Sequence, residues 1–427
     1  MAATFLSAPL SPEFIAPALT LVTFCLFLKA LHTDNKKLIF EKEQIIFIAF
    51  ICWQIVGIFY SKSFVDSIVT TLTGILLFFG YIFVSNLINS RERLDKILFA
   101  ATLSGGIAGA MGIGQILLFH FGGYIAKPLK TMFNPFWRNM NVYLVKMLYT
   151  VILPKKVAGM LPHVVQIDIV TRANSTFTNP VFFACFLVMV LPFAAYCFFY
   201  LKDKRKKWIS LVCAVMIAGG VASSYSRGPY LAAAVTVFVL LFMGRKQAIK
   251  MLAVSPLLLL LIPTGVFKRL LSLLGSGDIS INTRSAIWAD CIEILKKKWL
   301  FGMGPGVANV RKLLVGTYGI NQPHAHNIIL QLMLEGGIIG TSIFVAAIVF
   351  IIVEMVKLGI RSKEGRSLGV AVIASITGFL TCGMTDYVIY GAKVLQYFMM
   401  ILGLALAARR IFLEVEAKKH EIPEPEK

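Results

Sequence analysis

The stretch Asn321–Gly340, NQPHAHNIILQLMLEGGIIG, begins with polar residues and continues into an apolar run that extends to about residue 357. This run is longer than the roughly 20 residues that a helix needs to cross a bilayer. In lipid, only helices and closed barrels satisfy every backbone hydrogen bond, and barrel strands alternate polar and apolar side chains. The stretch therefore predicts a membrane helix whose polar entrance carries His324, His326 and Asn327.

The rest of the chain has the same character. Of its 427 residues, 58% are hydrophobic and 15% are charged, and the mean hydropathy is +0.79. Soluble domains have roughly 45–50% apolar and about 25% charged residues. The apolar blocks predict spans near residues 14–31, 43–60, 66–88, 97–121, 180–201, 208–223, 229–243, 251–265, 328–357, 368–390 and 394–412. We expect an all-α, polytopic integral membrane protein of about 11–12 transmembrane helices with two long basic periplasmic segments.

The net charge of +21 comes from basic residues that lie mainly in short loops between the apolar blocks, as membrane topology requires, so nucleic-acid binding is not expected. Basic residues concentrate in alternate short loops, which are cytoplasmic by the positive-inside rule and place the N-terminus outside and the C-terminus inside. These loops contain Lys36, Lys37 and Lys42; Arg91, Arg93 and Lys96; KDKRKK at 202–207; Arg245, Lys246 and Lys250; Arg361, Lys363 and Arg366; and Arg409 and Arg410.

Two long segments on the opposite, periplasmic side, 122–179 and 266–327, are also basic. Long loops translocate despite their charge, so this charge points to anionic lipid head groups or an anionic substrate. Part of the first segment, 131–152, has the composition of an interfacial amphipathic helix. The expected regions are 1–121, N-terminal transmembrane helices; 122–179, periplasmic segment; 180–265, central transmembrane helices; 266–327, large periplasmic loop with active-site residues; 328–412, C-terminal transmembrane helices; and 413–427, cytoplasmic tail.

The histidines at the mouth of the 328–357 span are candidates for acid–base chemistry. A helix N-terminus carries a partial positive charge, which disfavours imidazolium and attracts anions. Neutral imidazole is the form that a general base requires, so His326 is a candidate base. The alternative is that His324 and His326 are interfacial polar residues, and that Gly336, Gly337 and Gly340 serve only close helix packing.

Three arginines on the same side are candidates for phosphate binding, because the guanidinium fork matches phosphate oxygens. Arg227 lies in ASSYSRGPYLA, Arg284 begins a helical pattern at about 285–298 that ends in a glycine-rich turn, and Arg172 lies in TRANSTFTNP. Snorkelling to head groups is the alternative for Arg227. Glu335 and Asp386 lie towards the same face, where they could orient His326 or an arginine. A histidine pair two residues apart with no further ligand in view is a poor metal site.

These residues resemble a known family. His326 and Asn327, nine further residues, and then Gly337 and Gly340 fit the signature of bacterial O-antigen ligases, in which His precedes Asn, Ser or Gln. Those enzymes share a superfamily with polysaccharide polymerases and protein O-oligosaccharyltransferases. The pattern of Arg284, Trp288 and LFGMGPG is also similar to that superfamily, as are SYSRG around Arg227 and FTNP at 177–180.

The resemblance implies a glycosyltransferase of the bacterial inner membrane with a periplasmic active site. It implies a donor glycan on undecaprenyl pyrophosphate and lipid A–core oligosaccharide as acceptor, without metal, nucleotide or other cofactor. By this resemblance His326 would activate the acceptor hydroxyl, and Arg227 and Arg284 would bind the pyrophosphate. Single displacement would invert the anomeric carbon. The expected substrate-binding residues are Arg172, which lies close to FTNP, and His324, Asn327, Gly337 and Gly340.

Other functions stay open at this point. A polymerase would extend the same lipid-linked glycan. A protein O-oligosaccharyltransferase is less expected, because only a short charged tail follows the last span. A glycolipid transporter would suit the breaks at Pro256 and Pro263, although few acidic residues lie within the spans. We expect a monomer whose partners are the two glycolipid substrates and the membrane lipids.

Overall fold

The computed structural model describes residues 16–35, 37–41, 44–125, 172–244, 279–318 and 324–421. Within these ranges every regular element is a helix. The elements are α2 (Ala16–Thr33), α3 (Gln44–Tyr60), α4 (Phe64–Leu87), α5 (Arg91–Ile125), α8 (Pro180–Tyr200), α9 (Lys204–Ser223), α10 (Arg227–Gly244), α13 (Ile279–Lys298), α14 (Val307–Tyr318), α15 (Ile328–Arg361), α16 (Lys363–Gly383), the 3-10 turn η4 (Val388–Tyr390) and α17 (Ala392–Glu421).

Seven of the described helices are long and apolar enough to cross a membrane: α4, α5, α8, α9, α15, α16 and α17. The apolar parts of α2, α3 and α10 are shorter. The prediction of an all-α, multi-pass membrane protein is confirmed. The predicted span at 251–265 with its two prolines, and the amphipathic helix at 131–152, lie outside the described residues.

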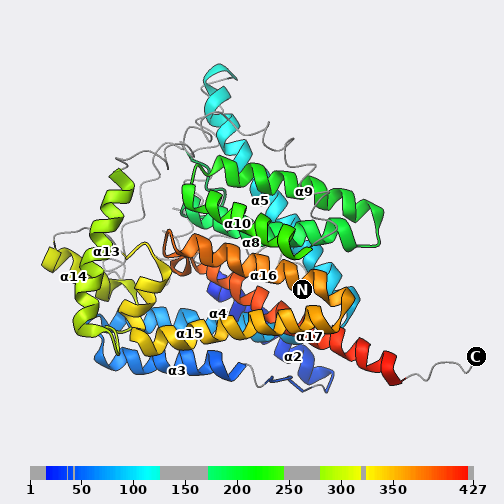
Figure 1. Cartoon of the computed structure of the whole chain (residues 1–427), viewed down its shortest axis with the longest axis horizontal. Coiled ribbons are helices and arrows are strands. Elements are labelled where there is room, and N and C mark those ends of the chain that lie inside the picture. The colour runs from blue at the N-terminus through cyan, green and yellow to red at the C-terminus, as the bar shows by residue number, and fades with distance from the viewer. Residues whose placement is uncertain are drawn as a thin grey trace, which may run out of the picture.

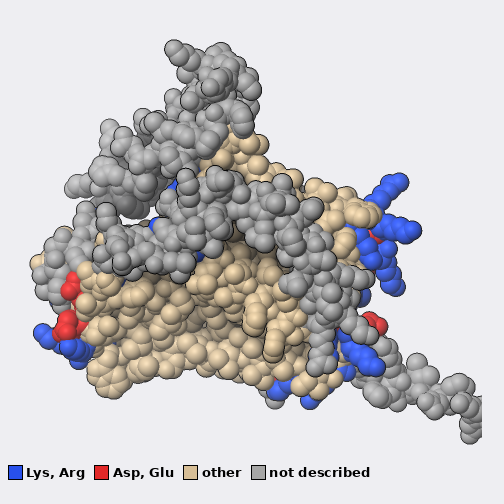
Figure 2. All heavy atoms as spheres, turned by 45° about the horizontal axis from the view of Figure 1, so that its top comes forward, with Lys and Arg blue, Asp and Glu red and all other residues tan. Residues whose placement is uncertain are grey.

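The apolar helices lie side by side, and α13 and α14 sit together at one end of the bundle (Figure 1). We call this end, with residues 299–306, 324–327 and 384–390, the histidine end. The opposite end, with the connections at 88–91, 201–204 and 361–363, we call the basic end. Most of the Lys and Arg side chains that are visible in Figure 2 stand at the edges of the face, and a broad area without charged side chains lies between them, as a bilayer crossing requires.

Local sequence determines where several helices begin. Asn179 caps α8 by accepting from the N–H of Val181, and Pro180 occupies the first helical position. Asp203 caps α9 in the same way at the basic end. Inside the bundle α8, α16 and α17 form the most buried layer, where Phe379 stacks on Phe398 with ring centroids 3.9 Å apart.

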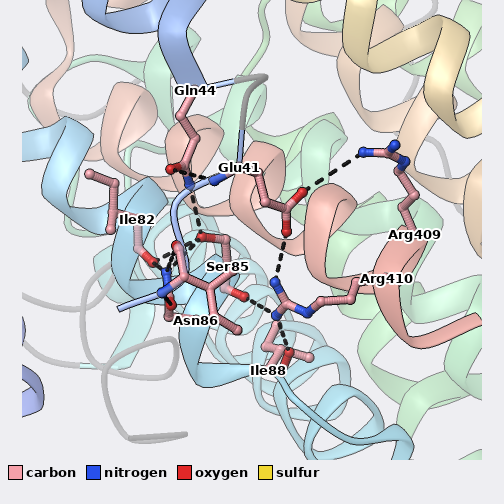
Figure 3. A network of polar contacts seen from close by, with 9 residues as sticks. Glu41, Gln44, Ile82, Ser85, Asn86, Ile88, Arg409 and Arg410 are labelled. Carbon is pink, nitrogen blue, oxygen red and sulfur yellow. Dashed lines mark hydrogen bonds and ion pairs between the residues drawn. The ribbon is translucent and has the colours of Figure 1, made fainter. Parts of the chain in front are cut away.

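A polar network closes the basic end (Figure 3). Glu41 accepts from Arg410 at 2.7 Å and lies 3.8 Å from Arg409, which in turn binds Glu354 on α15 at 2.8 Å. Arg410 also donates to the carbonyls of Ser85 and Ile88 at the end of α4. The network therefore ties the segment before α3, the end of α4, α15 and α17 to one another.

The helix α15 is broken at Gly337, which has φ 63° and ψ −167°. The loop at 299–306 lies against the break and pairs with the backbone groups there. The carbonyl of Trp299 accepts from the N–H of Ile338 at 2.7 Å, and the N–H of Met303 donates to the carbonyl of Leu334 at 2.8 Å. A Cβ at Gly337 would collide with the carbonyl of Leu300, so only glycine fits. The sequence predicted one continuous span here.

Candidate functional site

The histidine loop, residues 324–327, is fixed by the cap of α15. The side-chain oxygen of Asn327 accepts from the N–H groups of Ile329 at 3.0 Å and Leu330 at 3.1 Å. Its amide nitrogen donates to the carbonyl of Met384 at 3.2 Å. Asn327 therefore caps one helix and joins it to the turn that ends α16, in agreement with the predicted helix start.

Asp386 lies in that turn and binds His326. The His326 Nδ1 and Asp386 Oδ1 atoms are 3.0 Å apart, and the N–H of Tyr387 donates to the same oxygen at 2.8 Å. An ionised carboxylate can only accept, so Nδ1 of His326 carries a proton and donates it to this bond. The tautomer with its proton on Nδ1 has its lone pair on Nε2, the nitrogen that a general base would use.

The carboxylate of Asp386 stays ionised although it is buried. Burial raises its pKa, but the hydrogen bond from His326, the electrostatic interactions with the His324 and His326 rings, and the N–H of Tyr387 outweigh burial. Together they hold the pKa of Asp386 below its ordinary value. Only 6% of the Asp386 side chain is exposed, compared with 21% for His326, so the imidazole is the open member of the pair.

His324 is buried behind His326 and acts as an acceptor. Its Nδ1 accepts from the backbone N–H of His326 at 3.3 Å, and the two ring centroids are 4.3 Å apart in an edge-on arrangement. Burial lowers the pKa of His324 to about 4, against the opposing charge of Asp386 and with a further lowering from His326. His324 is therefore neutral at physiological pH, and its 3.9 Å approach to Asp386 is not an ion pair.

Arg227 lies beside the same turn. It is the first residue of α10, and the next residue, Gly228, packs against Thr385 so closely that a Cβ would collide with the threonine side chain. Thr385 directly precedes Asp386. The start of α10, which carries Arg227, therefore packs against the turn that carries Asp386, the partner of His326.

Arg284 lies on α13, a helix that contacts the histidine loop. Trp288 is one helical turn after Arg284 on α13, and its indole N–H donates to the carbonyl of Ala325 at 2.9 Å. Ala325 is the residue between the two histidines. Residues four apart share a helix face, so Arg284 lies on the face of α13 that meets the histidine loop.

Arg172 binds the turn that directly precedes Arg227. Its Nε donates to the carbonyl of Ser224 at 3.1 Å, and its terminal nitrogen donates to the hydroxyl of Ser226. The loop that follows is held by Gln115, which accepts from the N–H of Ser175 at 2.8 Å. Lys393, which is only 2% exposed, donates to the carbonyl of Thr176 at 2.7 Å. The structure thus fixes Arg172 to the turn that precedes α10.

Gly337 and Gly340 have different surroundings. Gly337 packs on Leu300 and Phe301, and a Cβ at Gly340 would lie 2.7 Å from the Trp53 ring. Both contacts belong to the joint between α15, α3 and the 299–306 loop. The substrate-binding role expected for these glycines stays a prediction.

A second layer of polar contacts was not predicted in full. Gln331 accepts from the N–H of Ala325 at 2.9 Å and donates to Glu335 at 2.7 Å, and Glu335 accepts from the N–H of Gly306 at 3.2 Å. Glu335 therefore supports the backbone of the histidine loop through Gln331. The i, i+4 spacing of Gln331 and Glu335 was the one available signal in the sequence.

The arrangement offers one imidazole for proton transfer and two arginines, Arg227 and Arg284, on elements that contact the histidine loop or the adjoining turn. Among the described residues, His324, His326 and Asp386 also form a group whose potential metal-ligand atoms lie within 4.8 Å of one another. The sequence showed only two of these three ligands.

Comparison with known proteins adds one finding. Residues 211–345 match the family described as O-antigen ligase. The matched range contains Arg227, Arg284, the histidine loop, Gly337 and Gly340, whereas Arg172 and Asp386 lie outside it. No curated protein matches the chain.

Proposed function

We propose that this chain, whose residues 211–345 match the O-antigen ligase family, transfers O-antigen polysaccharide from undecaprenyl pyrophosphate to lipid A–core oligosaccharide. The family supports a glycosyltransferase that acts on lipid-linked glycans. The ligase reaction, its donor and its acceptor are the finer part of the proposal. The observation that carries it is the His326–Asp386 pair, 3.0 Å between Nδ1 and Oδ1, at the meeting point of the elements that bear Arg227 and Arg284.

In the proposed reaction, Nε2 of His326 takes the proton of an acceptor hydroxyl while the hydroxyl oxygen attacks the anomeric carbon of the donor glycan. Asp386 stabilises the imidazolium that forms, through the Nδ1–H bond. The bond from the anomeric carbon to the pyrophosphate oxygen breaks, and undecaprenyl pyrophosphate leaves with the electron pair. A single displacement inverts the anomeric centre.

In the proposed reaction, arginines stabilise the negative charge that develops on the leaving pyrophosphate. Gly228, next to Arg227, packs on Thr385, and Trp288, one turn after Arg284, donates to Ala325. We therefore place the donor diphosphate between the two arginines, on the far side of the reacting carbon from His326. Guanidinium groups bind two phosphate oxygens at once and do not lose their proton in proteins. We assign to Arg227 and Arg284 the stabilisation of the leaving group. To Arg172 we assign a supporting role, in which it holds the turn that precedes Arg227.

The proposed site faces the periplasm of the inner membrane. The loops at the basic end contain Lys202 and the lysines and arginine that follow it, together with Arg361 and Lys363. The positive-inside rule places such loops in the cytoplasm and therefore places the histidine end outside. Lipid-linked donor and glycolipid acceptor would both approach from the outer leaflet.

Reconstitution of the purified chain tests the proposal. The donor is glycan on undecaprenyl pyrophosphate, and the acceptor is either lipid A–core or a second lipid-linked glycan, with mass analysis of the product. We expect glycan joined to lipid A–core. A product that appears only with the second lipid-linked glycan would make the chain a polymerase, and movement of glycan across the vesicle without a new bond would make it a transporter.

Two variants belong in this experiment. His326→Ala removes the proposed base, and His32→Ala removes a solvent-exposed histidine in the last turn of α2, at the basic end. Transfer should be lost in the first variant and retained in the second.

A further inference from the structure

We propose that His324, His326 and Asp386 form a capture site for zinc and similar transition-metal ions, and that an ion bound there switches off the base. The three side chains come from two separate segments, the histidine loop and the turn after α16. Two imidazoles and one carboxylate form the ligand type that zinc, cobalt and nickel prefer, with further positions left for water.

The distances suit a tetrahedral ion. Metal–ligand bonds of about 2.0–2.1 Å separate neighbouring ligand atoms by about 3.3 Å in that geometry. Oδ1 of Asp386 lies 3.0 Å from Nδ1 of His326 and 3.9 Å from Nδ1 of His324, and the three ligand atoms all lie within 4.8 Å of one another. Small side-chain rotations are enough to admit an ion, and the partly exposed ring of His326 leaves a path from solvent.

Each ligand atom is available for a stated reason. Nδ1 of His324 already presents its lone pair, because it accepts the backbone N–H of His326. The Asp386 oxygen now accepts the Nδ1–H of His326, and the ion would replace that proton between the two atoms. Capture therefore costs the bond between His324 and the His326 backbone and the bond between Asp386 and His326.

The consequence for His326 is a change of tautomer. A neutral imidazole carries one proton, so an ion on Nδ1 moves that proton to Nε2. Nε2 then holds a hydrogen and cannot accept the proton of an acceptor hydroxyl. The ion bound at Nδ1 therefore disables the base at Nε2, although it does not occupy the space beside Nε2 where the acceptor would lie.

An ion at this site inhibits transfer, and the proposed reaction does not use it. The positive charges of Arg227 and Arg284 on adjacent elements oppose a cation, so we expect weaker binding than at a closed site with four protein ligands. The loss of transfer rests on the proposed function, whereas binding of the ion does not.

Metal binding is measured first, in the purified full chain without donor or acceptor. Cobalt is added in small steps and the visible absorption of tetrahedral cobalt is followed, and zinc is then used to displace it. We expect one ion per chain. Asp386→Asn and His324→Ala should weaken binding by at least about tenfold, because even loss of an indirect supporting group costs about 10–100-fold. His32→Ala should bind as the wild type does.

Equal cobalt binding in wild type, Asp386→Asn and His324→Ala would overturn the site, as would loss of binding in His32→Ala. Asp386→Asn preserves the shape of the side chain, so it keeps the test valid if His324→Ala fails to fold.

The transfer assay then tests the consequence. Zinc should inhibit over the same concentration range in which it displaces cobalt, and a chelator should restore full activity. In active wild type, unchanged activity at zinc saturation would refute the tautomer switch. A chain that binds cobalt but never transfers glycan would contradict the proposed function and leave the metal site intact.

Discussion

The backbone N–H of His326 donates to Nδ1 of His324 at 3.3 Å, and His326 has the left-handed backbone angle φ 50°. A residue with a side chain rarely adopts this conformation, which costs of the order of 1–3 kcal/mol unless its surroundings enforce it. The neutral His324 supplies that constraint from within the same loop. His324 is thus a positioning residue, which acts on the proposed base through its backbone.

The first prediction follows from this bond. His324→Ala removes the acceptor and should lower kcat for transfer by about tenfold, with little change in KM, since about 1.4 kcal/mol corresponds to one factor of ten. His324→Asn carries an acceptor oxygen in place of Nδ1 and should recover most of the rate. Steady-state kinetics of both variants check this. Equal loss in both would show that the imidazole has another role.

The second prediction concerns pH. The pKa of His324 is about 4 in the folded chain and 6.5 in its unperturbed form. Between these values the unfolded state binds the proton and the folded state does not, so acid favours unfolding. Stability linked to His324 is complete above pH 6.5 and is lost as pH falls towards 4, by about 2 kcal/mol at pH 5.

Asp386 acts in the same direction, because its lowered pKa contributes stability that is lost as pH falls through the folded value. Thermal unfolding of the chain in detergent, at pH 7.5 and pH 5, measures the effect of His324, because the contribution of Asp386 is lost only at pH values below 3.8, the ordinary pKa of its side chain. His324→Asn does not titrate, so its melting temperature should fall less on acidification than that of the wild type. An identical fall would contradict the assignment to His324.

The third prediction concerns the break in α15. Gly337→Ala introduces a Cβ at φ 63° that collides with the carbonyl of Leu300, so the variant should unfold at a markedly lower temperature. Gly114→Ala is the matched control on α5, where a Cβ would meet nothing within 4 Å. That variant should be neutral or slightly more stable. A stable Gly337→Ala would mean that α15 can run straight.

The fourth prediction separates stability from chemistry. Glu41→Gln breaks the charged contacts with Arg410 and Arg409 at the basic end. The variant should destabilise the chain by about 1–2 kcal/mol, because these are charged hydrogen bonds between partly exposed side chains. The rate of transfer at a permissive temperature should not change, because the network lies at the end opposite to His326. Glu92→Gln removes a solvent-exposed partner of Lys96 and should leave the melting temperature unchanged.

Hydropathy predicted the described spans well, because length and apolar composition are properties of each segment alone. The capping position of Asn327 was also readable, since a helix start leaves local signals. The expectation that Asp386 could orient His326 agrees with their 3.0 Å contact.

Contacts between distant segments were harder to predict. A glycine that packs helices and a glycine that breaks one have the same appearance in a sequence, so the break at Gly337 was not foreseen. Trp288 meets the histidine loop only because α13 folds back against it. The short helix α14 was missed, since 12 residues are too few for a span signal.

A side-by-side transfer assay of three forms of the chain shows whether His326 is the base of a glycan transfer at the histidine end. Wild type, His326→Ala and His32→Ala are reconstituted at equal amounts and given glycan on undecaprenyl pyrophosphate with lipid A–core. We predict that His326→Ala inserts and folds as the wild type does but forms no detectable ligated product, while His32→Ala retains the wild-type rate. Full transfer by His326→Ala would exclude His326 as the base.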